Sequence, residues 1–494
     1  MAVITSAQNR YSSLSNEPGG ATDPSAGGPD FYFSLPNPIG IGNCVILGLS
    51  YAYNAARTVA IKDYATIDDA KANVNILDTW SGTPEATVND AGLALTTSIF
   101  RLKNAKGGGQ AFRITFDNPV YSVQFVCDEW YNVDIAAAVD TTWTNNADSL
   151  PSVSGGSAKT PGVAGCLIWH IGVDVSSIST SNAGVSGTLT KMTAGTNFTR
   201  RVAEYNVGQF VQISIQGSAT SVNPTLTTTG TSTDAYNSVA IAIRPAMAGT
   251  PPPANTIRIA SVAAIRNTNS TTYTSGFPTE GNLIIYETTS DGPSISKIQD
   301  SLNAKPFTMF ANGIDSVFSY LLNPPSVGPT MDITITLSSG SNMGLLIDVV
   351  NCAGFDNFFI LNSYTEPYGN ADIPDAIQIN PVTPNGLVLG IAAFGQGPPS
   401  GPIGPGEIFD NVWYAGMGDA GAGFNTGDGH MHKYNTTAVP VSLGMHVTQI
   451  PPLAATTVNA IAVAFIGPVP ESLGGRAPST VIPTYNKMPR QQRM

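Results

Sequence analysis

Short apolar runs with the length of a β-strand occur twice along this chain, in the same order. The run 42–47 returns as 281–285, and 237–245 returns in looser form as 459–465 followed by Gly and Pro. Two further pairs match 123–127 with 345–350 and 165–171 with 386–391. Strand-like runs that repeat in matching order predict a tandem duplication of a β module.

The individual runs carry the period of a strand. Phe112, Ile114 and Phe116 alternate with polar residues and are expected on one face of a sheet, with 331–337 as the counterpart in the second half. Small and polar residues at 7–10 resemble those at 264–267, so each segment is expected to be a first strand.

The offset between the two halves is not constant. The first half is therefore expected to carry extra residues between Asp63 and Thr97, and the segment 67–72 is expected to form the one short helix.

Composition also favours strands over helices. Charged residues make up only 11% of the chain, whereas there are 50 Gly and 36 Pro. Surface helices need charged outer faces, while strands can be joined by turns rich in Gly, Pro, Asn and Ser. Disorder is the competing interpretation, but the 42% hydrophobic content in regular runs favours packed cores. We therefore expect an all-β chain of two tandem antiparallel β-sandwiches of jelly-roll type, with extended terminal arms.

The length of 494 residues suits two domains. The predicted division is a first module with an N-terminal strand and a Gly/Pro-rich loop over 1–247, a Pro-rich linker over 248–255, a second module over 256–468 and a basic C-terminal arm over 469–494. Three successive prolines at 251–253 favour a stiff, extended linker.

The net charge and the lack of long apolar stretches limit the kinds of partner that the chain can bind. A net charge of −12 argues against binding to nucleic acid, which needs clustered Lys and Arg. Neither a secretory signal nor an apolar stretch of about 20 residues is visible, so no membrane partner is expected.

The four cysteines, Cys44, Cys127, Cys166 and Cys352, form no CxxC motif and are expected to be small buried hydrophobes. Cys127 and Cys352 are expected near the ends of equivalent strands.

Two groups of residues invite a chemical interpretation. His430 and His432 have the HxH spacing of metal ligands, but no third ligand follows nearby, so no metal site is predicted. Asp128 and Glu129 precede Trp130, and paired carboxylates beside an aromatic ring are what a glycan hydrolase would use. A strand end with an acidic turn and a packed Trp explains the same residues and is preferred.

His170 lies inside an apolar run, which favours a hydrogen-bonded core or edge residue over a catalytic base. The chain is therefore predicted not to be an enzyme, with no catalytic residue and no cofactor.

Two regions are candidate contacts with partners. The aromatic pair Trp413 and Tyr414 follows a long Gly/Pro-rich loop at 395–406, and such loops are usually functional or held by a partner. The C-terminal tail carries Lys487, Arg490 and Arg493. It could dock on an acidic neighbour, or it could be a solvated chain end.

Tandem sandwiches, a Gly/Pro-rich segment near the start, few charges and the run 237–245 that ends the first module together resemble virion surface proteins of tailed bacteriophages, of the head-decoration, head-fibre or tail-fibre type. The resemblance implies synthesis in a host cytoplasm, a final place on the virion surface, contacts with major capsid or tail subunits, and a homo-oligomer.

Three functions remain open at this point. The first is a structural virion surface protein that self-assembles and contacts neighbouring subunits. The second is a tail-fibre or receptor-binding adhesin that recognises a host surface glycan. The third is a glycan-acting hydrolase.

Overall fold

A computed structural model confirms that the chain is all-β, with mainly antiparallel sheets and a single short helix among the residues that it describes. It describes residues 3–14, 30–52, 57–90, 95–147, 152–174, 191–204, 209–229, 236–247, 258–268, 272–276, 283–290, 295–302, 308–312, 316–322, 332–337, 344–353, 357–368, 373–379, 386–394, 411–418, 425–435, 441–445 and 456–466. Side chains are described mainly in the first 247 residues.

The first group of strands, which we call sandwich I, contains α1 (Ile67–Ala72) and the strands β1 (Thr5–Leu14), β2 (Asp30–Ser34), β3 (Cys44–Ala52), β4 (Val59–Tyr64), β5 (Asp78–Thr79), β6 (Ala86–Asp90), β7 (Leu95–Leu102), β8 (Ala111–Phe116) and β9 (Tyr121–Tyr131). Its sheets have the orders β1-β9-β3-β7-β6 and β2-β8-β4-β5. This is the strand order of a jelly roll, with one strand added beyond β7.

Sandwich II repeats this order with β10 (Thr141–Ala147), β11 (Ser152–Ser154), β12 (Leu167–Asp174), β13 (Lys191–Thr193), β14 (Thr199–Glu204), β15 (Gln209–Ile215), β16 (Thr225–Thr229) and β17 (Tyr236–Ile243). Its strand orders are β10-β17-β12-β15-β14, which is part of an eight-stranded sheet that continues into the second half, and β11-β16-β13. The strand order thus separates two sandwiches within the first half of the chain, where the sequence repeats indicate one.

The second half shows the same pairings. Sandwich III contains β18 (Arg258–Thr268), β19 (Thr272–Gly276), β20 (Leu283–Ser290), β21 (Ile295–Asp300), β22 (Thr308–Asn312), β23 (Ser316–Leu322), β24 (Asp332–Leu337) and β25 (Gly344–Ala353). Sandwich IV contains β26 (Asn357–Tyr368), β27 (Ile373–Ile379), β28 (Gly386–Phe394), β29 (Asn411–Gly418), β30 (Asn425–Asn435), β31 (Val441–Met445) and β32 (Thr456–Ile466). The orders β18-β25-β20-β23-β22 and β26-β32-β28-β30-β29 match those of sandwiches I and II strand for strand.

Three described elements, α1, β5 and β13, have no counterpart among the described residues of the second half. The prediction of extra residues with a short helix at 67–72 is confirmed. The domain boundaries at 247 and 256 stay a prediction, because two of the sheets include strands from both sides of them.

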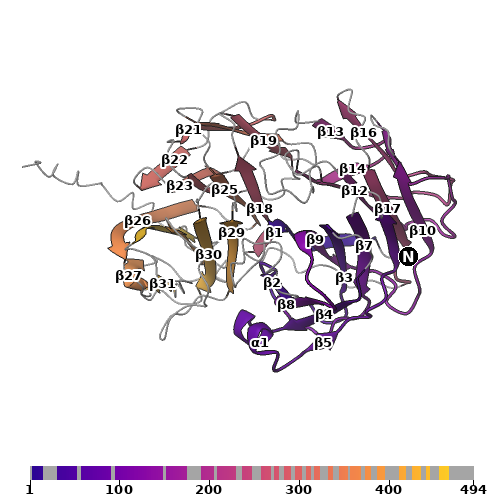
Figure 1. Cartoon of the computed structure of the whole chain (residues 1–494), viewed down its shortest axis with the longest axis horizontal. Helices are drawn as coiled ribbons and strands as arrows, with labels where there is room; N and C mark the ends of the chain where they lie inside the picture. The colour runs from indigo at the N-terminus through magenta and orange to yellow at the C-terminus, as the bar shows by residue number, and fades with distance from the viewer. Residues whose placement is uncertain are drawn as a thin grey trace, which may run out of the picture.

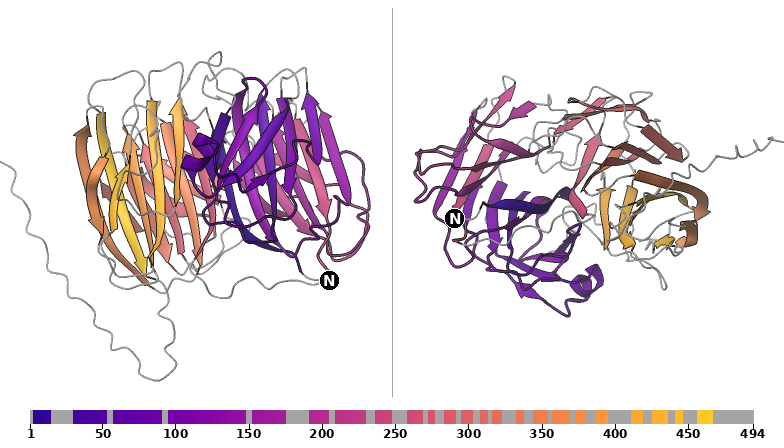
Figure 2. Two further views of the ribbon diagram at one scale, coloured as in Figure 1. Left: turned by 90° about the horizontal axis from the view of Figure 1, so that it is seen from below. Right: turned by 180° about the vertical axis from the view of Figure 1, so that it is seen from behind.

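Strand β1 joins the two halves. It pairs antiparallel with β9 and parallel with β18, so that sandwiches I and III share one ten-stranded sheet. Figure 1 shows β1 and β18 side by side near the centre of the molecule, and in the left view of Figure 2 the strands of both halves run in one general direction. Strands β1 and β18 occupy equivalent positions in sandwiches I and III. Because they pair in parallel, an approximate two-fold axis that runs along the strands relates the two halves.

The register corrects one match made from the sequence. A β-bulge separates Ser6 from Gln8 in β1, and an equivalent bulge separates Ile259 from Ser261 in β18. Ala7 therefore corresponds to position 260 and not to Ala264. The proposed match was four residues out because these strands are short of the large apolar residues that would fix an alignment.

The same registers place Cys352 opposite Leu283, as Trp130 lies opposite Cys44. The strands of Cys127 and Cys352 are equivalent, as predicted, but the two cysteines do not occupy equivalent positions.

The interior of sandwich I is packed from alternating residues of its two sheets. Phe112, Ile114 and Phe116 all lie in this core, as the alternation predicts. Phe33 stacks on Phe112 with ring centroids 4.6 Å apart, and Trp80 meets Phe112 edge to face at 5.9 Å. Aromatic pairs of this kind add to the stabilisation from burial alone.

Candidate functional site: the junction between sandwiches I and II

Sandwiches I and II each contribute five strands to a larger sheet, and these two five-stranded parts face each other across a buried junction. In β12, Ile168 points into sandwich II, whereas the neighbouring Trp169 reaches β3 of sandwich I. All eight positions of β7 and all eight of β17 are buried. A strand that is covered on both faces has a continuous apolar run in place of alternation, which explains the run Val239–Ile243.

Close packing in the junction depends on one glycine. A Cβ atom on Gly48 of β3 would lie 2.5 Å from Cη2 of Trp169 and 3.2 Å from Cδ1 of Ile171. The absence of a side chain at this position therefore lets the indole ring lie directly against the backbone of the opposite sheet.

An ion pair is buried in the same junction. Nε of Arg201 lies 3.1 Å from Oδ1 of Asp128, with side-chain exposures of 4% and 0%. Nε1 of Trp169 donates to the other carboxylate oxygen of Asp128 at 2.6 Å. The guanidinium also covers the ring of Trp130, 5.4 Å from its centroid. A buried carboxylate is tolerated only when charge and hydrogen bonds compensate it, and Arg201 and Trp169 provide both from sandwich II.

The same arginine holds strand β1. Its Nη2 donates to Oγ of Ser6. With the amide of Asn9 turned so that its oxygen faces the guanidinium, that oxygen accepts from Nε at 2.9 Å and from Nη2 at 2.8 Å. Arg201 thus links sandwich II both to sandwich I and to the strand that connects the two halves.

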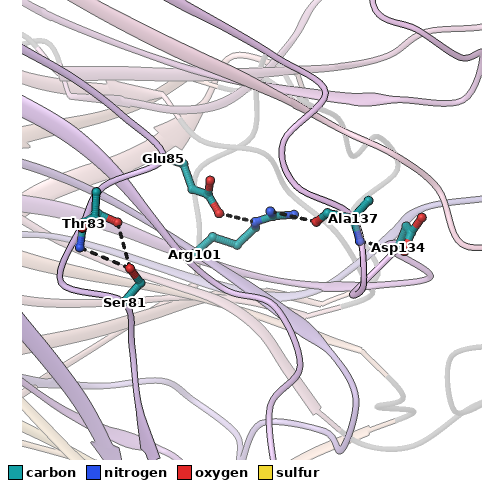
Figure 3. Close-up of polar contacts among 6 residues, drawn as sticks. All are labelled: Ser81, Thr83, Glu85, Arg101, Asp134 and Ala137. Atoms are coloured by element: carbon teal, nitrogen blue, oxygen red, sulfur yellow. Dashed lines mark hydrogen bonds and ion pairs between the residues drawn. The ribbon is translucent and has the colours of Figure 1, made fainter.

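A second arginine fastens the connection from sandwich I to sandwich II (Figure 3). Nε of Arg101 donates to Oε1 of Glu85 at 2.9 Å, and Nη2 donates to the carbonyl of Ala137 at 3.2 Å. Asp134 accepts from the backbone of Ala136 and Ala137, which closes a local turn. Ala137 lies between β9 and β10, so Arg101 fixes the path of the chain between the sandwiches.

The carboxylates proposed for a glycan hydrolase do not converge. Asp128 turns to the junction, whereas Glu129, the next residue of β9, accepts hydrogen bonds from Gln8, Asn43 and the backbone of Gly40. The two residues are 0% and 2% exposed. Because consecutive residues of a strand face opposite sides of the sheet, this pair cannot flank one glycosidic bond. The preferred interpretation is right about the strand end and the packed Trp130, but wrong about an acidic turn, because both carboxylates lie within β9 and are buried.

His170 lies beside a serine, as a catalytic base would, but its hydrogen bonds are not those of a base. Its Nε2 lies 2.7 Å from Oγ of Ser238, and its Nδ1 lies 2.8 Å from Nε2 of Gln212. The amide of Gln212 is oriented by the N–H of Gly195 and the carbonyl of Thr225, so it donates to Nδ1. His170 therefore carries its proton on Nε2 and donates to Ser238, the reverse of a nucleophile–base pair.

Burial also lowers the pKa of His170 to about 3 and leaves the ring completely covered. The prediction of a hydrogen-bonded core or edge residue is confirmed, and the structure places His170 in the core.

The remaining predicted residues have different outcomes. Cys44, Cys127 and Cys166 are buried, as predicted, and burial raises the pKa of the Cys44 thiol to about 12. No group of three or more His, Cys, Asp or Glu side chains in the described part of the chain is arranged to hold a metal ion. Within the same residues, no helix has the length and apolar character needed to cross a membrane.

The candidate partner contacts lie far from this junction in the sequence. Trp413 and Tyr414 belong to β29, opposite His430 and Gly429 of β30, and their side chains are outside the described set. Strand β29 is last in its sheet and contacts β2 of sandwich I. The loop 395–406 and the tail residues Lys487, Arg490 and Arg493 lie outside the described residues.

Sequence reasoning missed the junction itself. Asp128 was considered only as one carboxylate of a hydrolase pair, and Arg201, 73 residues further along the chain, belongs to no motif. The available signal was the pair of adjacent arginines, Arg200 and Arg201, in a chain with few charges. No model of a known protein family matches the sequence, and a search of curated proteins finds no match.

Proposed function

We propose that this chain is a structural protein of a virion surface, of the capsid-decoration or head-fibre type, which self-assembles and contacts neighbouring virion subunits. The observation that carries the proposal is the jelly-roll strand order of sandwiches I and II, repeated in sandwiches III and IV. Jelly rolls are a common architecture of viral capsid proteins. Repetition enlarges a rigid surface without adding a reaction centre.

The use of buried polar groups supports the same proposal. Asp128, Arg201 and Arg101 connect one sandwich to another or fix the chain between them. Glu129 and His170, the other titratable groups with a chemical interpretation, are engaged inside the fold. Buried polar side chains used in this way hold the sandwiches rigidly together, as a structural protein requires.

A glycan-binding adhesin is the second candidate, because jelly rolls are also the architecture of many lectins. The aromatic pair in β29 is the feature that favours it, since Trp and Tyr side chains stack readily on sugar rings.

One experiment separates these functions. Immunogold electron microscopy with antibodies against the purified chain should label the heads or tails of virus particles at regular positions. Particles that carry no label would contradict a virion protein. The purified chain should give no signal on a glycan array if its role is structural, whereas specific binding would favour the adhesin.

A double substitution, with a matched control, tests the adhesin function more closely. The double substitution Trp413→Ala and Tyr414→Ala should abolish glycan binding but leave particle labelling intact if the adhesin function holds. Val74→Ser, at a position 48% exposed in sandwich I, is the matched control and should change neither readout.

A further inference from the structure

Strand β1 occupies a slot in the middle of the ten-stranded sheet. On one side it pairs with β9 from Thr5 to Leu14, and on the other side it pairs in parallel with β18 over four residues, 9–12. Without β1, the backbone groups of β9 and β18 that it pairs with would have no partner. Unpaired strand edges bind a further strand readily.

The slot is lined by side chains that other contacts hold in position. Glu129 is fixed by Asn43 and by the backbone of Gly40 at 2.8 Å, and it accepts from Nε2 of Gln8 at 2.6 Å. Oε1 of Gln8 accepts from the backbone N–H of Asn37 at 2.8 Å. The carboxylate would therefore remain in place if the strand left.

The second fixed group is Arg201. Asp128 and the ring of Trp130 orient its guanidinium, which then reaches Ser6 and Asn9 of β1. Close to the start of the strand, Nδ2 of Asn132 donates to the carbonyl of Val3 at 2.9 Å. Recognition is thus distributed along the strand and comes from groups of sandwiches I and II.

The strand itself has the composition of a soluble segment. Its sequence, TSAQNRYSSL, contains few large apolar residues, although Gln8 and Asn9 are only 2% and 3% exposed in place. A mostly polar strand exposes little apolar surface when it leaves the protein for water, and main-chain hydrogen bonds provide its affinity.

The connection to β2 is long enough for exchange. Fifteen residues separate Leu14 from Asp30, and they include three prolines and four glycines. Fully extended, such a segment spans about 50 Å.

We propose that the slot between β9 and β18 is an exchange site for β1, and that it accepts this strand from a second copy of the chain. Each copy then donates its N-terminal strand to a neighbour, and the contacts made by Gln8 and Asn9 are the same within one chain and between two. Exchange of an identical element is a low-cost route to a homo-oligomer. This inference does not depend on a virion, so its test needs only the purified chain.

The test uses the full chain with a site-specific protease sequence inserted between Gly27 and Gly28. One preparation has natural isotopes and the other is uniformly ¹⁵N-labelled. They are mixed at high concentration, incubated and then cut, and native mass spectrometry identifies which strand each body retains. We expect bodies that carry the strand of the other label, approaching half of the total, and a dimer population that rises with concentration before cleavage.

Samples that are mixed only after cleavage, and kept cold, give the background. Retention of own-label strands alone at every concentration would overturn the proposal, and so would loss of the strand from every body on cutting.

Variants locate the exchange site. Arg201→Gln should lower the retained strand several-fold, whereas Arg244→Gln, which removes a partly exposed partner of Asp140, should not. Gln8→Ala changes only the strand, and should also lower retention several-fold if Arg201→Gln does not fold. Equal retention in Gln8→Ala and the unsubstituted chain would contradict recognition through Glu129 and Asn37.

Discussion

The interior of sandwich I and its junction with sandwich II bury opposite faces of the same strands, but they are built differently. Val45, Leu47 and Leu49 of β3 enter an interior made of aliphatic and aromatic side chains. The opposite face of β3 presents Gly48 to Trp169 in a junction that also holds the Asp128–Arg201 ion pair. The interior is thus specified by apolar volume, whereas the junction is specified by one close approach and one charge pair.

This difference explains why a chain with only 11% charged residues buries an ion pair between two sandwiches. Apolar faces can slide over each other at little cost, while a buried ion pair with directional hydrogen bonds fixes their relative position. We infer that Asp128 and Arg201 set the alignment of the two sandwiches, and that the apolar contacts around them provide most of the stabilisation.

The largest expected effect comes from breaking the ion pair. Asp128→Ala should lower the free energy of unfolding by about 3–5 kcal/mol, because it leaves the Arg201 guanidinium buried without its carboxylate. Arg201→Met should also destabilise the chain, and the double variant should lose much less than the sum of the two. Urea unfolding of the four proteins measures this coupling, and additive losses would show that the pair does not act as a unit.

The second-largest expected effect is on the pH dependence of stability, and it comes from Asp63, away from the junction. Burial and the neighbouring Asp78 raise the pKa of Asp63 to about 7, with Lys106 acting in the opposite direction. The folded state therefore binds a proton that the unfolded chain releases near pH 4. This contribution to stability is fully present below about pH 4 and is lost as the pH rises to about 7.

The shift of about three pKa units sets an upper limit of about 4 kcal/mol on this effect. Asp63→Asn should abolish this pH dependence and stabilise the chain at pH 8. Urea unfolding at pH 5 and pH 8 tests this, with the exposed Asp117→Asn as the control. A pH profile that the Asp63→Asn substitution leaves unchanged would refute the assignment.

Overpacking the junction should have a smaller effect. Gly48→Ala places a methyl group against the Trp169 ring and should cost about 1–3 kcal/mol. Gly217→Ala, where nothing lies within 4 Å of the added Cβ, should stay within about 0.5 kcal/mol of the unsubstituted protein. Equal melting temperatures for the two variants would mean that the sheets separate easily.

The smallest effect concerns the helix on the outer side of sandwich I. Oγ1 of Thr66 accepts from the backbone N–H of Asp69 at 3.1 Å and caps α1. Thr66→Ala should cost about 1 kcal/mol, mostly in local opening of the helix, whereas Thr66→Ser should keep the cap. Hydrogen exchange of the α1 amides measures this, and faster exchange throughout the junction strands would contradict the independence of the two regions.

The sequence predicts those parts of the fold in which the burial or conformation of a residue shows in a local sequence pattern. The alternation of Phe112, Ile114 and Phe116, the helix at 67–72 and the buried state of His170 all follow from local patterns. The separation of each half into two sandwiches does not, because strands buried on both faces, such as β7 and β17, lose the alternation that would show where they lie.

The junction and the β1 slot were beyond sequence reasoning for a related reason. Gln8 meets Glu129 across 121 residues, and Arg201 meets Ser6 across 195. Contacts between residues so far apart in the sequence can be found only when the strand order is known. A polar strand such as β1 also lacks the apolar pattern from which its central position could be predicted.

Hydrogen–deuterium exchange of the intact chain tests the central claim most directly, because it reports whether the polar strand β1 holds the two halves in one sheet. The backbone amides of β1 that pair with β9 should be protected for hours, to a similar degree as those of β9. Complete exchange of these amides within seconds, with β9 still protected, would contradict it.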